Sequence, residues 1–377
     1  MNKIIRSLAH NLYNMPGWHT NRHIVVIESD DWGSIRMPSR KVYEQFLKEG
    51  IRVDKDVYCR YDSLASKGDL EALFDVLTSV KDKNGHNAVL TADSVVANPD
   101  FKKIRESGFK KYYYEPFTET LKKTGEHEGV FTLWKEGLKV GIFHPQFHGR
   151  EHLNINKWLE VLRQGEDKIT MRAFELGSFG LTSAVSSSIN KNYMGAFNSC
   201  EDNDIKDYDI ILKEGLDLFE KLFGYRSTSF IATTYTWSPL LEPYLNKLGI
   251  KYLQGLVSQH VPLDSGERFC YKNNNFQGKR NACGQIYLMR NCFFEPSHFR
   301  DKFDVVDDCM NRIKIAFRWG KAAVISSHRV NYIGNIDITN RDKNIGLFRS
   351  LLHNIIKEWP DVEFISSDNL GDIISKK

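Results

Sequence analysis

Two adjacent aspartates, Asp30 and Asp31, directly follow an apolar run at 24–27 with the sequence IVVI. A β-branched run of this kind that ends near Gly33 is typical of a buried parallel strand. Two carboxylates at the end of a strand repel each other unless a cation or a shared proton relieves the repulsion. The pair therefore indicates a metal site. The alternative is a helix start, with Asp30 as the N-cap and Asp31 in the solvated first turn.

Two histidines further along the chain are candidates for the other metal ligands. His148 and His152 are four residues apart in FHPQFHGREHLN, after an expected strand at 138–143. On a helical turn, this spacing places both imidazoles on one face, where both can reach one ion. Two histidines and one carboxylate are a common ligand set for Zn²⁺ or another divalent metal. His144, one turn earlier, is a candidate for an extra ligand or for a partner of the ligands.

A further histidine, His328, follows the apolar run AAVISS, which predicts a late strand at 322–327. In parallel α/β barrels the reacting groups gather at the carboxyl ends of the strands. We therefore expect the aspartate pair, the histidine pair and His328 to converge, although they are far apart in the sequence. For each single histidine the alternative is a structural role in the packed interior.

The elements that must position these residues are short β-branched runs alternating with amphipathic segments. This alternation predicts a parallel sheet, either open or closed into a barrel. Strands are expected near 24–28, 87–91, 138–143, 226–231, 250–254, 284–289, 322–327 and 361–366. Helices are expected near 39–49, 69–82, 99–107, 154–164, 205–223, 238–248, 301–319 and 342–357.

The whole chain, 1–377, is expected to form a single domain with two long insertions. The insertions are expected at about 165–204 and 255–300, where the periodic pattern of strands and helices is interrupted. Loops of this length inside a compact domain usually serve as a lid or a binding surface.

The composition is that of an ordinary globular protein, with 41% hydrophobic and 27% charged residues. The formal net charge is +4 and no dense run of Lys and Arg occurs, so no nucleic-acid partner is expected. No apolar stretch is long enough for an export signal or a transmembrane segment, and we therefore expect a cytoplasmic protein. The six cysteines show no C-x-x-C spacing and are expected to be free thiols.

A short helix is expected near the start of the sequence. Ile4, Ile5, Leu8 and Leu12 would share one face of it. This face is expected to pack on the body of the protein, and the alternative is a weak association with a membrane surface.

The motifs resemble those of the polysaccharide deacetylase family (carbohydrate esterase family four), which removes N- or O-acetyl groups from chitin, peptidoglycan and related glycans. Its first motif, a strand ending in Thr-Phe-Asp-Asp-Gly, is matched by ESDDWG at 28–33, and its His-x-x-x-His motif by 148–152. The third motif, Arg-x-Pro-Tyr, is only partly present at 226–230, and the last, Leu-x-His, is matched loosely at 326–328. The family's Asp/Trp motif has no assignable counterpart. The resemblance implies a distorted or incomplete (β/α) barrel of the seven-stranded type, with long loop insertions.

The resemblance also implies a ligand set for the metal. The implied ligands are Asp31, His148 and His152. Zn²⁺ is the first candidate for the metal, and Co²⁺, Ni²⁺ and Fe²⁺ are alternatives because the same ligands accept them.

The catalytic roles implied by the resemblance fall on three more residues. Asp30 would be the general base, His328 the general acid, and Arg226 would orient Asp30 by charge pairing. A backbone N–H near 227–230 would help to stabilise the oxyanion.

Several residues at expected strand ends are candidates for contacts with a substrate. Trp32, Tyr235 and Trp237 could stack on a sugar ring, and their alternative role is aromatic packing in the core. Asp93 could line the same mouth or be a simple turn residue. Glu295 and Asn331 are similar cases.

These inferences together predict a metal-dependent hydrolase that removes an acetyl group from a sugar or glycan intermediate. Two alternatives remain open. The Asp/His/His set is also found in non-haem iron oxygenases, although that function leaves Asp30 and His328 without roles. The second alternative is a non-catalytic glycan-binding protein with a vestigial metal site.

Overall fold

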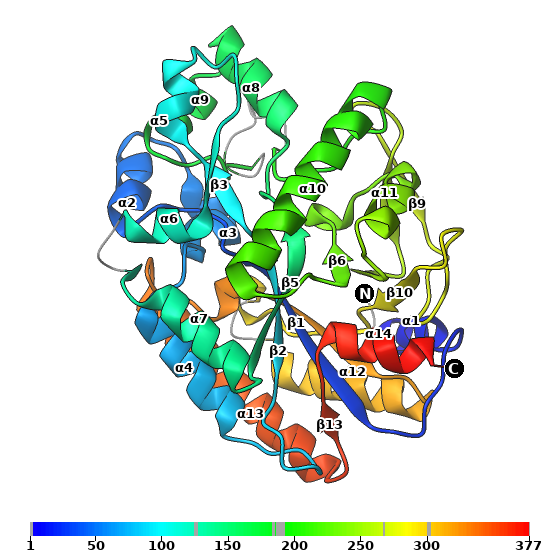
Figure 1. Ribbon diagram of the computed structural model, residues 1–377. Coiled ribbons are helices and arrows are strands. Elements are labelled where there is room, and N and C mark those ends of the chain that lie inside the picture. The colour runs from blue at the N-terminus through cyan, green and yellow to red at the C-terminus, as the bar shows by residue number, and fades with distance from the viewer. Residues whose placement is uncertain are drawn as a thin grey trace.

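A curled sheet of parallel strands lies at the centre of the molecule, with helices packed around its outside (Figure 1). The computed structural model describes residues 3–123, 127–182, 185, 193–266, 268–299 and 303–376. The strand order is β10-β7-β6-β5-β2-β1-β12-β11, and β13 pairs with β1. The strands are β1 (Ile24–Trp32), β2 (Leu90–Val95), β5 (Phe143–Gly149), β6 (Ser229–Ile231), β7 (Tyr252–Gly255), β10 (Ile286–Met289), β11 (Cys292–Phe293), β12 (Ala323–His328) and β13 (Glu363–Phe364).

The two ends of this strand order, β10 and β11, are separated in the chain only by Arg290 and Asn291. The backbone N–H of Arg290 donates to the carbonyl of Gly255, at the end of β7. The N–H of the next residue, Asn291, donates to the carbonyl of Val324 in β12. One stretch of chain therefore passes from one edge of the curled sheet to the other. The expected distorted or incomplete α/β barrel is confirmed.

The helices follow the strands in the βα order that the sequence predicts, with additional helices before β1 and after β13. The helices are α1 (Lys3–Asn14), α2 (Arg40–Lys48), α3 (Val57–Tyr61), α4 (Lys67–Thr78), α5 (Phe101–Glu106), α6 (Phe117–Lys122), α7 (Val130–Lys139), α8 (Ile155–Gln164), α9 (Lys168–Glu175), α10 (Asp202–Phe223), α11 (Glu242–Lys247), α12 (Val305–Arg318), α13 (Ile338–Glu358) and α14 (Ser367–Ser375). Short 3₁₀ turns lie at Val53–Lys55, Thr233–Tyr235, Pro239–Leu241, Pro296–His298 and Arg329–Asn331. Two antiparallel strand pairs, β3 (Ala97–Pro99) with β4 (Tyr114–Pro116) and β8 (Gln259–Pro262) with β9 (Phe269–Lys272), lie outside the main sheet.

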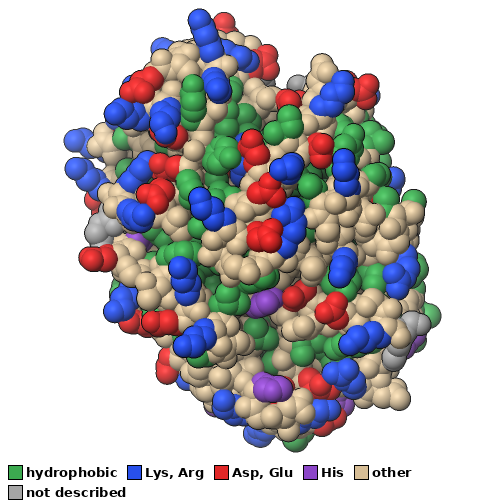
Figure 2. Space-filling model, in the orientation of Figure 1, with side chains coloured by type: hydrophobic (Ala, Val, Ile, Leu, Met, Phe, Trp, Pro, Cys, Tyr) green, Lys and Arg blue, Asp and Glu red, His purple; other side chains and the backbone are tan. Residues whose placement is uncertain are grey.

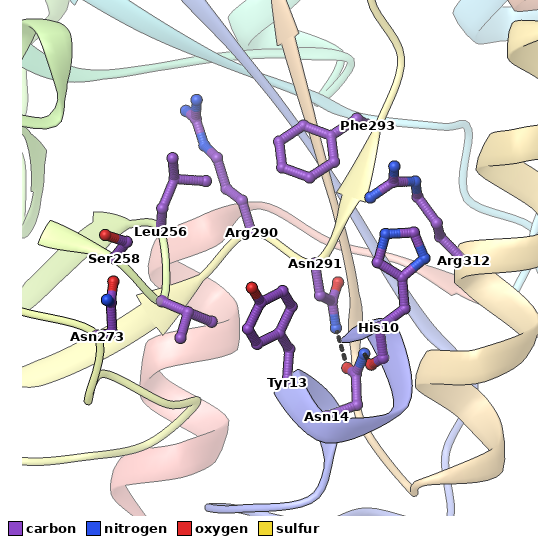
Figure 3. Close-up of a pocket in the computed structure, with 11 residues that line it drawn as sticks. His10, Tyr13, Asn14, Leu256, Ser258, Asn273, Arg290, Asn291, Phe293 and Arg312 are labelled. Atoms are coloured by element: carbon purple, nitrogen blue, oxygen red, sulfur yellow. Dashed lines mark hydrogen bonds between the residues drawn. The ribbon is translucent and has the colours of Figure 1, made fainter. Parts of the chain in front are cut away.

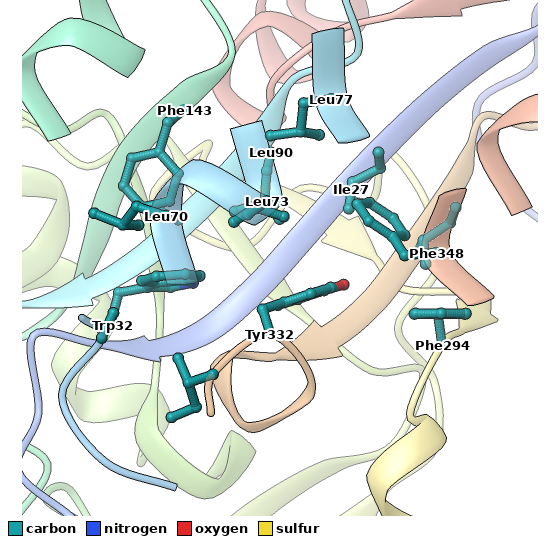
Figure 4. Packing of buried hydrophobic residues seen from close by; sticks show 14 of the residues in the cluster. Ile27, Trp32, Leu70, Leu73, Leu77, Leu90, Phe143, Phe294, Tyr332 and Phe348 are labelled. Atoms are coloured by element: carbon teal, nitrogen blue, oxygen red, sulfur yellow. The ribbon is translucent and has the colours of Figure 1, made fainter. Parts of the chain in front are cut away.

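The main core lies between the outer face of the sheet and the helices that cover it. Ile27 of β1 and Leu90 of β2 pack in one cluster with Leu73 of α4 and Phe348 of α13 (Figure 4). These side chains are fully buried. Because successive strand residues alternate between faces, Val25 joins the same cluster as Ile27, and their neighbours on β1 face the inside of the barrel.

The inside of the barrel is filled in layers. Ile24 and Val26 of β1 form the lowest layer together with Leu288 of β10, and Leu370 and Ile374 of α14 pack against them. Helix α14 contacts β1, β7 and β10, so it covers the amino-terminal end of the barrel. Above this apolar layer the buried side chains become polar, which places the candidate site residues at the carboxyl ends of the strands.

Some expected elements are displaced in the structure. The strand expected at 138–143 is wrong, because residues up to Lys139 belong to α7 and the strand β5 begins at Phe143. Of the expected insertions, 165–204 includes α9, and its residues 183–184 and 186–192 lie outside the described part of the chain. The region 255–300 includes a hairpin and also β10 and β11 of the main sheet.

The six cysteines are free, as expected, and three of them are buried. Among the described helices, none combines the length and the apolar character needed to cross a membrane. On the face shown in Figure 2, Lys and Arg side chains are interspersed with Asp and Glu.

Candidate active site

An irregularity at the end of β1 brings both aspartates to the mouth of the barrel. Neighbouring residues of a regular strand point to opposite faces. The pairing of β1 with β2 shifts between Ser29 and Trp32, and Asp31 has a φ of 75°. Asp30 keeps its register with β12, where it lies beside His328. The left-handed conformation is one that Asp tolerates better than most residues, so the local sequence permits the irregularity.

Asp31, His148 and His152 form a buried group that fits a metal ion. The Asp31 Oδ1 atom lies 3.6 Å from His148 Nε2 and 3.2 Å from His152 Nε2. One possible ligand atom from each residue lies within 4.8 Å of the others. His148 Nδ1 is 2.9 Å from the carbonyl of Ile231 and therefore carries the proton, which leaves the lone pair on Nε2. This Nε2 has no hydrogen-bond partner among the described residues.

The two histidines do not lie on a helical turn, so this part of the sequence interpretation is wrong. His148 is in β5, and His152 is in the loop that follows this strand. Gly149 between them has a φ of 120°, which favours glycine over residues with a side chain. The side chain of Asn154 accepts a hydrogen bond from the backbone of α8 and so ends the loop as the helix cap.

A buried ion pair holds the loop between the two histidines. Arg150 Nε donates to Glu151 Oε2 at 2.7 Å, and Arg150 Nη1 donates to Glu214 of α10. The Arg150 guanidinium also lies 4.2 Å from the centre of the Tyr114 ring. Arg150 and Glu151 are both buried, so this contact fixes the backbone that positions His148 and His152.

Arg36, which the sequence analysis did not single out, binds the other oxygen of the Asp31 carboxylate. Its Nη2 donates to Asp31 Oδ2 at 3.0 Å, so Oδ1 is left to face the histidines. Burial opposes the ionisation of Asp31, but Arg36 and His152 hold its pKa well below the usual range. Burial and the nearby Arg36 lower the pKa of His152 to about 4. The imidazole is therefore neutral at physiological pH, which is the form that binds a metal.

Arg290, not Arg226, pairs with Asp30. Its Nη1 and Nη2 donate to the two oxygens of Asp30 at 2.7 and 2.6 Å. Burial opposes the ionisation of Asp30, but the guanidinium lowers its pKa to about 2. Arg226 instead contacts Asp217 and Glu220 on α10. The prediction for Arg226 is wrong because this residue precedes β6 and so lies at the amino end of the sheet, away from the mouth.

The backbone near Arg226 is likewise engaged away from the mouth. The N–H of Ser229 donates to the side chain of Gln146, and the hydroxyl of Ser227 accepts from the N–H of Phe147. Both residues are fully buried in the sheet. The oxyanion contact expected from 227–230 is therefore not supplied by Ser229.

Arg290 also binds two carboxylates below the mouth. Its Nε donates to Glu28 at 2.5 Å and its Nη2 to Asp93 at 3.0 Å. Asp93 is fully buried and accepts a second hydrogen bond from Gln254, so it does not line the mouth as the sequence analysis expected. Burial and the charge of Asp30 raise the pKa of Asp93 well above its usual value.

His328 lies at the mouth and is held by Glu295. Its Nδ1 is 2.6 Å from Glu295 Oε1, and its Nε2 is 3.6 Å from Asp30 Oδ2. Asn331 donates to the other oxygen of Glu295 at 2.8 Å. Burial opposes the protonation of His328, but Glu295 and Asp30 raise its pKa to about 9. The ring of Tyr58 lies edge-on to His328, with the centres 5.5 Å apart.

Two of the three aromatic residues expected to contact a sugar are core residues. Trp32 is 1% exposed and packs against Phe143 on the outer face of the sheet. Trp237 is 2% exposed and lies near Glu242, with 3.4 Å between Nε1 and Oε1. For both, the alternative of core packing holds, because no exposed face is left for a substrate.

Tyr235 is the aromatic residue that reaches the site. Its hydroxyl accepts a hydrogen bond from Arg290 Nη1 at 2.8 Å and lies 3.3 Å from the hydroxyl of Ser326. Both Thr234 and Tyr235 have positive φ, 57° and 55°. This strained turn after β6 places Tyr235, a partly exposed residue, at the mouth.

The remaining histidine of β5 lies away from the mouth. His144 is 3.1 Å from Asp368 of α14, measured from Nε2 to Oδ2. It is on the same strand as His148 but two side-chain layers lower, so it is not an additional ligand of the group at the mouth.

No protein-family profile and no curated protein matches the sequence. Solved structures with a similar arrangement include a protein of Pseudomonas aeruginosa PAO1 described as a probable polysaccharide deacetylase. It is 10% identical, with 97% of this chain and 96% of that chain covered and a TM-score of 0.48. The peptidoglycan deacetylase PdaC of Bacillus subtilis is 11% identical, with 94% and 92% covered and a TM-score of 0.34.

Another similar structure is the 4-α-glucanotransferase of Thermococcus litoralis. It is 10% identical over 93% of this chain, with a TM-score of 0.46. The chain spans only 40% of the length of that enzyme. The structural neighbours thus include several polysaccharide deacetylases, and they also include an enzyme with another activity on glycans.

Proposed function

We propose that the protein is a metal-dependent hydrolase that removes an acetyl group from a sugar or glycan intermediate. One observation carries the proposal: a buried Asp/His/His group lies beside a carboxylate and an imidazole that are each held by a separate partner. Hydrolysis of an amide or ester requires a base for the attacking water and an acid for the leaving group. The mouth of the barrel offers both within 3.6 Å of each other.

The residues present fit a divalent cation, because two imidazoles and one carboxylate are its usual protein ligands. Asp31, His148 and His152 would hold it, with Zn²⁺ as the first candidate and Co²⁺, Ni²⁺ or Fe²⁺ as alternatives. When bound, the cation would lower the pKa of a water molecule and polarise the acetyl carbonyl.

The proton transfers are assigned to the two flanking residues. Asp30 accepts the proton of the attacking water, and Arg290 keeps its carboxylate fixed in one orientation. His328 donates a proton from Nε2 to the departing amine or alkoxide, because Nδ1 is engaged by Glu295. The base and the acid thus have distinct environments, because Asp30 is held by the Arg290 guanidinium and His328 by the Glu295 carboxylate.

We infer from the sequence resemblance that the acetyl group is attached to a sugar. Tyr235, a partly exposed residue beside Arg290, is our candidate contact for the sugar. Trp32 and Trp237 are excluded from this role by their burial.

The proposal is tested by acetate release from a panel of N- and O-acetylated sugars, after removal of metals and reloading with Zn²⁺ or Co²⁺. Asp30→Asn and His328→Ala should lower the rate by at least about 100-fold while bound metal, measured by elemental analysis, is retained. His148→Ala should lose the metal as well. His144→Ala, on the same strand but outside the group, is the matched control and should keep its metal.

Two outcomes would contradict the proposal. One is a metal-loaded protein that releases no acetate from the whole panel. The other is an unchanged rate in Asp30→Asn and His328→Ala. Oxygen uptake with Fe²⁺ would support the oxygenase alternative instead, and binding of an acetylated sugar without turnover would support a glycan-binding protein.

A further inference from the structure

Asp62 is a fully buried aspartate that the sequence analysis did not single out. It directly follows α3, and its carbonyl accepts a hydrogen bond from the N–H of Met37 at 3.1 Å. Its side chain accepts two hydrogen bonds from Arg329, from Nε to Oδ1 at 3.0 Å and from Nη2 to Oδ2 at 2.9 Å. Burial raises the pKa of Asp62, while the Arg329 guanidinium lowers it. Paired contacts of this kind favour the ionised carboxylate.

Arg36 connects Asp62 to the candidate metal ligands. Its Nη2 donates to Asp31 Oδ2 at 3.0 Å, and its Nε lies 3.6 Å from Asp62 Oδ2, an ion pair without a hydrogen bond. The Arg36 guanidinium also lies 5.0 Å from the centre of the Tyr58 ring. Arg36 and both aspartates are buried, so solvent ions screen their charges little. The charge of Asp62 therefore acts on Arg36 and, through it, on Asp31.

A guanidinium that contacts a metal-binding carboxylate opposes the binding of a cation. Arg36 is always charged, and it contacts the carboxylate that belongs to the Asp/His/His group. Arg329, which directly follows His328, brings a second, fully buried guanidinium to the same side of the mouth. Among the described residues, these two arginines form ion pairs only with Asp31 and Asp62. Without the charge of Asp62, Asp31 alone would face both of them.

The other aspartate of the pair has a comparable arrangement. Arg290 binds Asp30, and the same guanidinium contacts the buried carboxyl groups of Glu28 and Asp93. In Figure 3 the side chain of Arg290 starts at the wall of a cavity of about 380 Å³, and its guanidinium points away from Tyr13. Each arginine that holds an aspartate at the mouth thus faces at least one further buried carboxyl group.

We propose that Asp62 is a positioning residue for the metal site, which keeps Arg36 on Asp31 Oδ2 and offsets its charge, so that Oδ1 and the two histidines can bind a divalent cation. This inference rests on the proposed metal site and adds to it a residue that touches neither the metal nor the substrate. The removal of such an outer partner commonly lowers metal affinity by about 10- to 100-fold.

The test is the affinity of the metal-free full chain for Zn²⁺, measured by competition with a chelating dye. Asp62→Asn keeps the shape of the side chain but removes its charge, and it should raise the Kd by about tenfold or more. The matched control is Asp82→Asn. Asp82 is also buried, but it precedes β2 and accepts hydrogen bonds from the backbone N–H groups of residues 84 and 86. Because it lies at the amino end of the sheet, this variant should keep the Kd within about twofold.

A second pair of variants tests whether Asp62 acts through Arg36. Arg36→Gln removes the guanidinium that Asp62 offsets. In this background, the further change Asp62→Asn should raise the Kd by less than about threefold, because the charge to be offset is gone. The double variant loses one charge of each sign, so this comparison decides the question even where Asp62→Asn alone does not fold. Thermal unfolding without metal shows which variants are folded.

The inference fails if folded Asp62→Asn binds Zn²⁺ like the unchanged protein, if Asp82→Asn loses as much affinity, or if Asp62→Asn has the same effect with and without Arg36. Each of these results leaves the hydrolase proposal intact, because the unchanged protein still binds Zn²⁺. An unchanged protein that binds no divalent metal would overturn both proposals. A protein with the expected affinities that releases no acetate would support the role of Asp62 and contradict the hydrolase.

Discussion

Arg290 binds both oxygens of the Asp30 carboxylate, although 260 positions separate the two residues. The same guanidinium also contacts Glu28 and Asp93, so one cation lies among three buried carboxyl groups. Asp30 is therefore fixed in orientation from below, while its upper side faces His328. A planar guanidinium suits this task better than an ammonium group, because it presents paired donors to one carboxylate.

We expect Arg290→Lys to lower kcat/KM for deacetylation by about 100-fold or more, because the ammonium cannot hold both oxygens of Asp30. Arg290→Met should in addition lower the free energy of unfolding by about 3–5 kcal/mol, since the buried carboxylate of Asp30 and its neighbouring carboxyl groups lose their common cation. Acetate release and denaturant unfolding measure the two effects. Arg226→Lys is the control and should change kcat/KM by less than about twofold, because Arg226 contacts Asp217, Glu220 and the carbonyl of Leu248, all away from the mouth. Equal losses in both variants would contradict the assignment of Arg290.

Metal binding should stabilise the folded protein through Asp31, His148 and His152. At a Zn²⁺ concentration of about 100 times Kd, the free energy of unfolding should rise by about 2.7 kcal/mol. Thermal unfolding with and without Zn²⁺ measures this rise. His148→Ala should abolish it, whereas His144→Ala should retain it because His144 contacts Asp368 lower in the barrel. A rise that persists in His148→Ala would place the metal elsewhere.

The alternation of strands and helices and the parallel sheet could be predicted from the sequence, because β-branched runs and amphipathic segments follow one another with little interruption. The rule that reactive groups follow parallel strands then singled out Asp30, Asp31 and His328, which the structure brings to one mouth. The same rule could have found Arg290, which directly follows the expected strand at 284–289. The motif resemblance points to Arg226 instead, but this residue lies before its strand, β6.

The features that could not be predicted depend on three-dimensional packing. The side chain of a tryptophan at a strand end can point to the core on the outer face of the sheet or to the mouth of the barrel. Trp32 points to the core and packs against Phe143. Arg36 has no motif, and its contact with Asp31 depends on the irregularity at the end of β1. The exposure of Leu8 and Leu12 was also beyond the sequence, because helical spacing shows that residues share a face but not which way the face points.

The two aromatic residues after β6 should separate stability from activity. Trp237→Ala should lower the free energy of unfolding by about 3–5 kcal/mol, because it leaves a cavity in a buried cluster. Tyr235→Phe removes only a hydroxyl at the mouth and should lower kcat/KM with an unchanged unfolding midpoint. Denaturant unfolding and acetate release, measured on both variants, decide between the roles. A Tyr235→Phe variant with normal kinetics would remove Tyr235 from the site.

The pH dependence of activity should report the environment of His328. A general acid must be protonated, and the pKa of His328 is raised to about 9, so the rate should fall as the pH rises through about 9. Burial opposes the protonated form of His328, while Glu295 and Asp30 favour it. Tyr58 and His298 also lie near the ring.

Glu295→Gln removes the negative charge closest to His328, so the fall in rate should move to lower pH. The pH–rate profiles of both proteins give the shift. Glu220→Gln is the control and should leave the pH–rate profile unchanged, because it removes a carboxylate that contacts Arg226 on the surface. An unshifted profile in Glu295→Gln would show that His328 is not the general acid.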